Sequence, residues 1–290
     1  MPAQPPSIAP AWWWRVLRSA LSTLLLGYLI IAVLLWAMQE RMIFIPTVGE
    51  AETTPDRWGL PFERHRLQTS DGESIDVWWM PHHKTGPVIL FCHGNAGNLG
   101  HRIDTFRALS MQGWSVVSFD YRGYGTSSGR PSEHGLYLDA QRVWEFLVED
   151  MGISAERIVL HGRSLGGGVA AYLAEQHQAA GLILESTFTS LPDVAAGLYP
   201  FLPVRLLARH HFPTVKRLPQ IDMPLLVIHG KGDRSIPFHH GEALYAAAAE
   251  PKFFQALEGD HNAGFIYEAD VWIGAIADFV HAVTQSENTP

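Results

Sequence analysis

The sequence is poor in cysteine and in positive charge. Cys92 is the single cysteine, so no intramolecular disulfide can form. Lys and Arg number 21 against 29 Asp and Glu, which gives a net charge of -8. With no basic stripe to neutralise phosphates, we expect no nucleic-acid partner. The glycines lack the Gly-x-Gly-x-x-Gly fingerprint with its downstream acid, so we expect no nucleotide or flavin cofactor.

Histidine is abundant, but its spacing does not indicate a metal site. Three doublets stand out among the 15 histidines: His82-His83, His210-His211 and His239-His240. A protein metal site usually adds cysteine or carboxylate ligands at short spacing, and these doublets have none. We therefore expect solvated surface side chains there, and no bound metal.

The longest stretch without charge lies near the amino terminus, and we call it the apolar run (Ala20–Met38, nineteen positions). At about 1.5 Å per residue, a helix of this length crosses the hydrocarbon core of a bilayer. Trp12 to Trp14 precede the run and Trp36 lies near its far end, where amphipathic rings favour the headgroup level. We predict a transmembrane anchor helix over residues 19–39.

Two other interpretations of the apolar run stay open, a signal peptide and a buried core helix. A signal peptide has a shorter apolar region and a small-x-small cleavage site, which Ala37-Met38-Gln39 matches poorly. A buried core helix usually keeps a polar face, which this run lacks. Residues 1–18 are expected to be disordered or juxtamembrane.

The charges that flank the apolar run give a weak signal for membrane orientation. Arg15 and Arg18 precede the run, while Glu40 and Arg41 follow it. The excess of basic residues on the amino-terminal side favours a single-pass protein with its large domain on the non-cytoplasmic side.

Strand-like and helix-like segments alternate through residues 40–285, which we interpret as one domain. The predicted strands are 62–67, 74–80, 88–91, 114–119, 157–160, 182–184, 225–228 and 253–257. Alternation with helices implies a mostly parallel central sheet flanked by helices. Asp71-Gly72 is a hairpin signal that adds antiparallel strands at one edge. Residues 187–221, with five prolines, interrupt the alternation and suggest a small helical insertion placed as a lid.

A Gly-x-Ser-x-Gly motif follows one predicted strand and opens a helix of small residues. On its own the motif is weak, but a strand-to-helix elbow needs residues without bulk, here Gly162 and Gly166, for Ser164 to project from the turn. The alternative is that Ser164 merely caps the helix.

At this point the chain resembles a known family. HGNAGN, DYRGYG, GRSLGGG and HGKGD occur in order, and QERMIFIPT follows the apolar run. Together they are similar to the single-pass membrane α/β-hydrolases of the Bem46 type and their bacterial relatives. The resemblance covers nearly the whole chain from the apolar run onward. It implies an α/β-hydrolase fold and a serine hydrolase that acts on an ester, thioester or amide.

A serine nucleophile needs a hydrogen-bonded base, and the chain order in this fold is nucleophile, acid, base. His261 lies in the loop after the last predicted strand and is the expected base. Asp233 lies in the loop after the preceding strand and is the expected acid, which would orient the imidazole. Glu185 is the reserve candidate for the acid. Asp260 is not favoured, because adjacent side chains usually point apart.

The tetrahedral intermediate also needs an oxyanion hole. Its two backbone N–H donors are expected from Leu165, directly after the nucleophile, and from Asn95, in a loop of small residues. Arg163 could steer an anionic substrate or pair with a local acid. Asp120 and Arg122 are expected to form a structural turn with an internal ion pair.

The predicted function is a carboxylesterase or acyl-thioesterase that works through a Ser-His-Asp triad. The expected substrate is a small-molecule or lipid-like acyl ester or thioester near a bilayer, with an acylated protein as a further candidate. A peptidase or amidase of the same fold is one alternative. A membrane-held interaction protein on a retired hydrolase scaffold is another.

Overall fold

A mixed eight-stranded sheet forms the centre of the computed structural model, which describes residues 12–262 and 264–284. The strand order is β10-β9-β8-β7-β4-β6-β3-β2. The strands are β2 (Glu63–Gln68), β3 (Ser74–Met80), β4 (Val88–Cys92), β6 (Ser115–Asp120), β7 (Ile158–Arg163), β8 (Gly181–Glu185), β9 (Leu225–Gly230) and β10 (Lys252–Leu257). The six strands from β10 to β6 pair in parallel, whereas β3 and β2 add antiparallel strands at one edge. This confirms the predicted α/β-hydrolase sheet and its hairpin.

Helices cover both faces of this sheet. The helices of the sheet are α2 (Ile103–Ser110), α3 (Glu133–Glu145), α4 (Leu165–Gln176), α8 (His239–Ala247), α9 (Gly264–Tyr267) and α10 (Ala269–Thr284). Apolar residues of α3, α4 and α8 pack in one core cluster, and those of α2 and α10 pack in a second. Every residue of β4, β8 and β9 is buried, which explains why these strands are mostly apolar.

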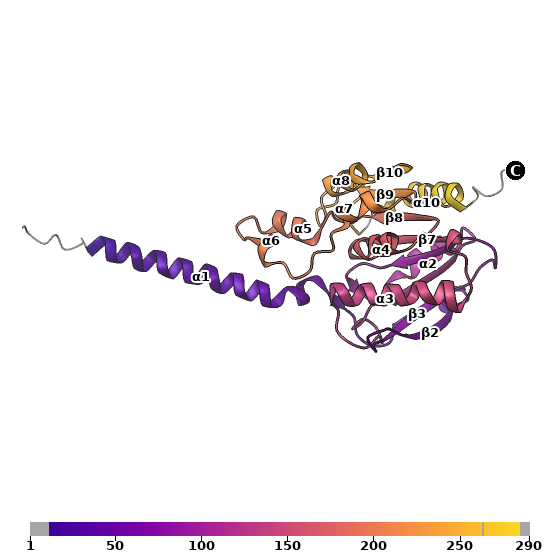
Figure 1. The fold of residues 1–290 in the computed structure, drawn as a ribbon, viewed down its shortest axis with the longest axis horizontal. Coiled ribbons are helices and arrows are strands. Elements are labelled where there is room, and N and C mark those ends of the chain that lie inside the picture. Colours follow the sequence, from indigo (N-terminus) through magenta and orange to yellow (C-terminus); the bar gives the residue numbers. More distant parts are fainter. Residues whose placement is uncertain (1–11, 263, 285–290) are drawn as a thin grey trace, which may run out of the picture.

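Helix α1 (Trp12–Ile43) contains the apolar run and projects away from the sheet (Figure 1). It is long and apolar enough to cross a membrane, with a mean hydropathy of 2.3 over an 18-residue stretch. The helix extends beyond the predicted span of 19–39 at both ends, so residues 12–18 are helical. The remaining part of the predicted disordered start, 1–11, and residue 285 of the predicted domain lie outside the described residues.

The chain that leaves α1 pairs with the loop after β4. Strand β1 (Ile45–Pro46) pairs in parallel with β5 (Ala96–Gly97), in a separate two-stranded sheet. The end of α1 is therefore close to the loop that contains Asn95.

The insertion (residues 187–221) lies between β8 and β9, and its helices are short. They are α5 (Leu191–Leu198), α6 (Val204–Leu207), α7 (Thr214–Arg217) and a 3-10 turn over Leu218–Gln220. Helices α5 and α6 lie beside α1 (Figure 1). Tyr28 and Gln39 of α1 bind backbone carbonyls of the insertion: the Tyr28 hydroxyl donates to the Phe201 carbonyl at 3.0 Å, and Gln39 Nε2 donates to the Leu207 carbonyl at 2.7 Å.

Two expectations about polar residues were wrong. His210 and His240 are only 7% and 3% exposed, so these members of the doublets are packed inside and are not solvated surface side chains. Arg122 does not pair with Asp120. Its guanidinium binds the carboxylates of Asp71 and Asp139 instead, because the fold brings the hairpin and α3 next to Arg122. The sequence does not indicate that these two elements lie beside Arg122.

Candidate active site

Ser164 occupies the sharp turn between β7 and α4. Its φ and ψ are 54° and -120°, a strained backbone conformation for a residue with a side chain. The Ser164 N–H donates to the Glu185 carbonyl at 2.9 Å, and the Thr187 hydroxyl donates to the Ser164 carbonyl at 2.6 Å. These two bonds to the neighbouring strand β8 and the residues after it hold the strained turn in place.

Gly162 and Gly166 flank this turn at positions with no room for a side chain. A Cβ at Gly162 would overlap the Gly166 carbonyl, and a Cβ at Gly166 would overlap the Cys92 carbonyl. Backbone atoms of a buried helix or strand cannot move aside cheaply. The glycines are therefore required by the close approach of α4 to β7 and β4, as the motif suggested.

Three predicted residues meet at the carboxyl edge of the sheet. His261, after β10, places its Nε2 3.0 Å from Ser164 Oγ. Its Nδ1 lies 2.6 Å from Asp233 Oδ2, in the loop after β9. A carboxylate only accepts hydrogen bonds, so Nδ1 carries the proton and Nε2 is left to accept the Ser164 hydroxyl. The arrangement can remove a proton from the serine as its oxygen attacks a carbonyl.

Asp233 is held in one orientation. Its Oδ1 accepts the N–H groups of Ser235 and Ile236 at 2.9 and 2.8 Å, so Oδ2 faces His261. The nearby His229 is fully buried and donates from Nε2 to the Ile236 carbonyl at 2.8 Å. Burial lowers the pKa of His229, which favours its neutral form.

The reserve acid Glu185 has other partners. Its carboxylate contacts His161 Nε2 at 2.8 Å, Trp272 Nε1 at 3.1 Å and Arg163 Nε at 3.3 Å. Burial alone would raise the pKa of Glu185, but the charge of Arg163 and the hydrogen bonds outweigh it and hold the pKa at about 2. Asp260 accepts the Asn262 N–H at 3.0 Å in a local turn. Asp233 is thus the carboxylate that contacts His261.

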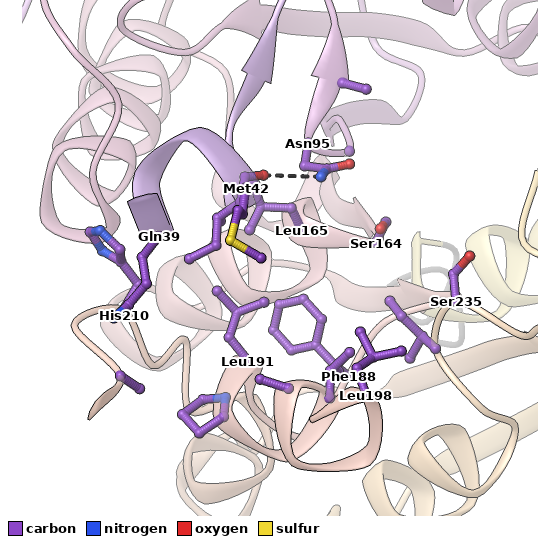
Figure 2. A pocket seen from close by; sticks show the side chains of 18 of the residues that line it. Gln39, Met42, Asn95, Ser164, Leu165, Phe188, Leu191, Leu198, His210 and Ser235 are labelled. Atoms are coloured by element: carbon purple, nitrogen blue, oxygen red, sulfur yellow. Dashed lines mark hydrogen bonds between the residues drawn. The ribbon is translucent and has the colours of Figure 1, made fainter. Parts of the chain in front are cut away.

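The two expected oxyanion donors, Asn95 and Leu165, lie near Ser164 (Figure 2). Gly94 comes so close that a Cβ there would lie 3.5 Å from the Ser164 Cβ. The Asn95 carbonyl accepts a hydrogen bond from the Tyr124 hydroxyl at 2.8 Å, and the Asn95 side-chain Nδ2 donates to the Ile43 carbonyl at 3.0 Å. No acceptor among residues 12–262 and 264–284 takes the backbone N–H of Asn95 or Leu165, so both donors are available.

A cavity of about 560 Å³ adjoins Ser164. Its walls come from the carboxyl edge of the sheet, from the insertion and from the end of α1. Met42 of α1 and Phe188 and Leu191 of the insertion border the same space as Ser164 (Figure 2). Most of the side chains from α1 and the insertion are apolar, so the cavity suits an acyl chain or another apolar group.

Sequence reasoning missed two parts of this cavity. The first is the wall formed by Leu35, Trp36, Gln39 and Met42 of α1, because an anchor helix gives no signal that one of its faces will meet a cavity. The second is Arg102, which also lines the cavity and whose guanidinium donates to the Ala96 carbonyl. Burial and the charge of Arg163 lower the pKa of Arg102 to about 10.

Comparison with known proteins agrees with this architecture. A family profile described as the alpha/beta hydrolase fold matches residues 87–204. An esterase of Pyrococcus furiosus superposes with a TM-score of 0.70 at 19% identity, over 83% of this chain and 98% of that one. The fold thus defines the class: an α/β hydrolase.

Relatives at higher identity narrow the class. An uncharacterized protein of Mycobacterium tuberculosis is 40% identical over 250 residues, which are 85% of this chain and 88% of that one. Protein bem46 of Schizosaccharomyces pombe is 32% identical, and the match covers 82% of this chain and 82% of that protein. An uncharacterized membrane protein of Saccharomyces cerevisiae is 33% identical over 92% of this chain and 97% of that protein. The chain belongs to the Bem46-type group of the α/β-hydrolase family.

Proposed function

We propose that this protein is a membrane-anchored serine hydrolase that cleaves acyl esters or thioesters. The observation that carries the proposal is the continuous hydrogen-bonded line from Ser164 through His261 to Asp233. The line ends at a strained elbow that opens onto the cavity. This is the arrangement that activates a serine for acyl transfer.

The reaction follows from the positions of these groups. Ser164 Oγ attacks the acyl carbon while its proton moves to His261 Nε2, and Asp233 stabilises the resulting imidazolium. The oxyanion accepts the backbone N–H groups of Asn95 and Leu165. The alcohol or thiol then leaves with the proton from His261, and an acyl-enzyme remains. Water attacks that ester with the same base, which releases the acid and restores Ser164.

The membrane part of the proposal rests on α1. Its side chains from Trp12 to Met38 are largely exposed, and in water that would be an unusually large apolar surface. We propose that α1 crosses the bilayer once, with the hydrolase domain of residues 40–285 on the non-cytoplasmic side. Small-molecule or lipid-like acyl esters or thioesters, or an acylated protein, are the proposed substrates.

The direct test is Ser164→Ala in the full chain. Turnover of p-nitrophenyl butyrate should fall by at least about a thousandfold, because the nucleophile is lost while the fold remains. Ser154→Ala, at an exposed surface position, is the matched control and should keep full activity.

A second measurement separates an enzyme from a retired scaffold. A fluorophosphonate probe should label wild-type Ser164 and leave the Ser164→Ala variant unlabelled. Absence of an adduct on the wild type, or undiminished turnover by Ser164→Ala, would refute the proposed nucleophile. Faster turnover of amino-acyl amides than of acyl esters would favour a peptidase.

A further inference from the structure

We infer that the tip of the insertion (residues 198–206) enters the bilayer leaflet crossed by the carboxyl-terminal half of α1, so that the substrate reaches Ser164 laterally from the membrane. The inference rests on the proposed membrane anchoring. It adds a second membrane contact and defines the substrate class as an amphiphile that resides in the bilayer with its acyl chain among the lipid tails.

The tip exposes large apolar side chains that substrate binding does not explain. Phe201 and Leu206 are 86% and 84% exposed, and Leu198 is 61% exposed. Phe201 and Leu206 do not line the cavity, so a bound acyl chain would leave them uncovered. A bilayer would cover them, because apolar surface gains free energy on leaving water.

The position of the tip along α1 identifies the bilayer as the occupant. The Phe201 carbonyl accepts a hydrogen bond from the Tyr28 hydroxyl. Tyr28 belongs to the apolar run and lies ten residues before the end of the run at Met38. At about 1.5 Å per residue, this contact lies about 15 Å along the helix from the end of the run. If the run is in the membrane, the tip has to be in it as well.

Apart from the hydrogen bond of Tyr28, the polar contacts between α1 and the insertion described here lie at the end of the apolar run. The Gln39 side chain accepts the Arg209 N–H at 2.8 Å, and the Arg209 guanidinium pairs with Glu40 at 3.0 Å. The same guanidinium lies 5.4 Å from the centre of the Trp36 ring. Tryptophan and paired charges of this kind are typical of the headgroup level. Arg205, the charged residue of the tip, pairs with Asp193 at 2.9 Å.

The cavity lies between the two elements that we place in the leaflet. Leu35 lines it from the apolar run and Met42 lines it just beyond the end of that run, while Leu198, Leu202 and Leu207 line it from the insertion. An acyl chain in the leaflet can therefore pass between α1 and the tip to the oxygen of Ser164 without crossing water. A long-chain ester of this kind would be a better substrate in vesicles than its solubility in water suggests.

Depth-dependent quenching tests the location of the tip. Phe201→Cys, Leu24→Cys and Met111→Cys are each labelled with an environment-sensitive fluorophore in the full chain, reconstituted in phosphatidylcholine vesicles that contain spin-labelled lipids. The native Cys92 is buried and stays unlabelled. Position 24 reports on the anchor, and position 111, 77% exposed on the hydrolase domain, is the control for water. We expect quenching at 201 and 24 and none at 111.

The outcomes distinguish failure of the inference from failure of the anchor. Quenching at 24 without quenching at 201 would overturn the inference and leave the anchor in place, and it would point to another partner at the tip. No quenching at either position would remove the membrane anchoring and the inference together. Labelling of Ser164 by the fluorophosphonate probe remains an independent test of the hydrolase in both cases.

A functional test compares two substrates on one variant. For Phe201→Ser combined with Leu206→Ser, the ratio of turnover on a long-chain acyl ester in vesicles to turnover on p-nitrophenyl acetate should fall about tenfold, because the tip no longer docks. Met111→Ser removes an equally exposed apolar side chain elsewhere and should leave the ratio unchanged. An unchanged ratio in the double variant would contradict entry from the leaflet.

Discussion

The guanidinium of Arg163 donates to the backbone carbonyl of His261, with Nη2 and the oxygen 3.1 Å apart. The Nε of Arg163 lies 3.3 Å from the buried carboxylate of Glu185. The sequence left two roles for Arg163, steering a substrate or pairing with a local acid, and the structure shows the second. Because this arginine connects a buried anion to the loop of His261, it is placed to position the imidazole.

Arg163→Ala should therefore lower kcat for p-nitrophenyl butyrate by about tenfold or more with little change in KM, since a displaced base slows chemistry more than binding. Arg163→Lys should recover only part of the loss, because an ammonium lacks the planar fork that reaches both partners. Arg130→Ala, at an exposed position, is the control. An unchanged kcat in Arg163→Ala would show that the His261 loop is held by other contacts.

The Asn95 side chain links the proposed oxyanion loop to the end of α1. Asn95→Ala keeps the backbone N–H but removes the hydrogen bond to the Ile43 carbonyl. We expect kcat to fall by about tenfold, less than the 10²- to 10³-fold typical for loss of an oxyanion donor, because the donor is displaced and not deleted. Steady-state kinetics beside Gln112→Ala, an exposed amide, would check this. Equal kcat values for both variants would exclude the link from the mechanism.

We predict opposite effects on stability for alanine at an elbow glycine, Gly166, and at a glycine in α5, Gly197. Gly166→Ala would push a Cβ into the Cys92 carbonyl, so the melting temperature should drop by several degrees. Gly197, in α5, has no atom within 4 Å of an added Cβ, so Gly197→Ala should be neutral or stabilise by up to about 1 kcal/mol. Thermal unfolding in detergent measures both. Similar melting temperatures for the two variants would mean that α4 can shift away from β4.

Asp120 predicts a pH dependence of stability. Burial, and then the charge of Asp76, raise the pKa of Asp120 from an ordinary 3.8 to about 8, against weaker opposing effects of the Leu99 N–H, Arg102 and Arg64. A carboxyl with a raised pKa favours the folded state in its neutral form. Its contribution is complete below about pH 4 and is lost as the pH rises to about 8.

Asp120→Asn keeps the acceptor for the Leu99 N–H but cannot ionise. The melting temperature of this variant minus that of the wild type should increase as the pH is raised from 5 to 8.5. Asp104→Asn, an exposed carboxylate, is the control and should run parallel to the wild type. A constant difference between wild type and Asp120→Asn across this range would show that Asp120 is already ionised in the fold at pH 5.

The sequence alone determined the class of the protein and the identity of the residues that meet. Strands such as Val88–Cys92 are apolar throughout because both of their faces are covered, and this pattern is local. Ser164, Asp233 and His261 each follow a predicted strand, and parallel strands bring their carboxyl ends to one edge. Their catalytic roles stay a prediction until Ser164→Ala is measured.

Only the tertiary structure decided which long-range partners these elements found. Arg122 pairs with Asp71 and Asp139, and Arg163 binds the His261 loop, although these residues are well separated in the chain. His210 and His240 are buried by elements that their own segments do not specify. Above all, it placed Tyr28 and Gln39 of α1 against the insertion. Local patterns report which face of an element is apolar, but not which distant element covers that face.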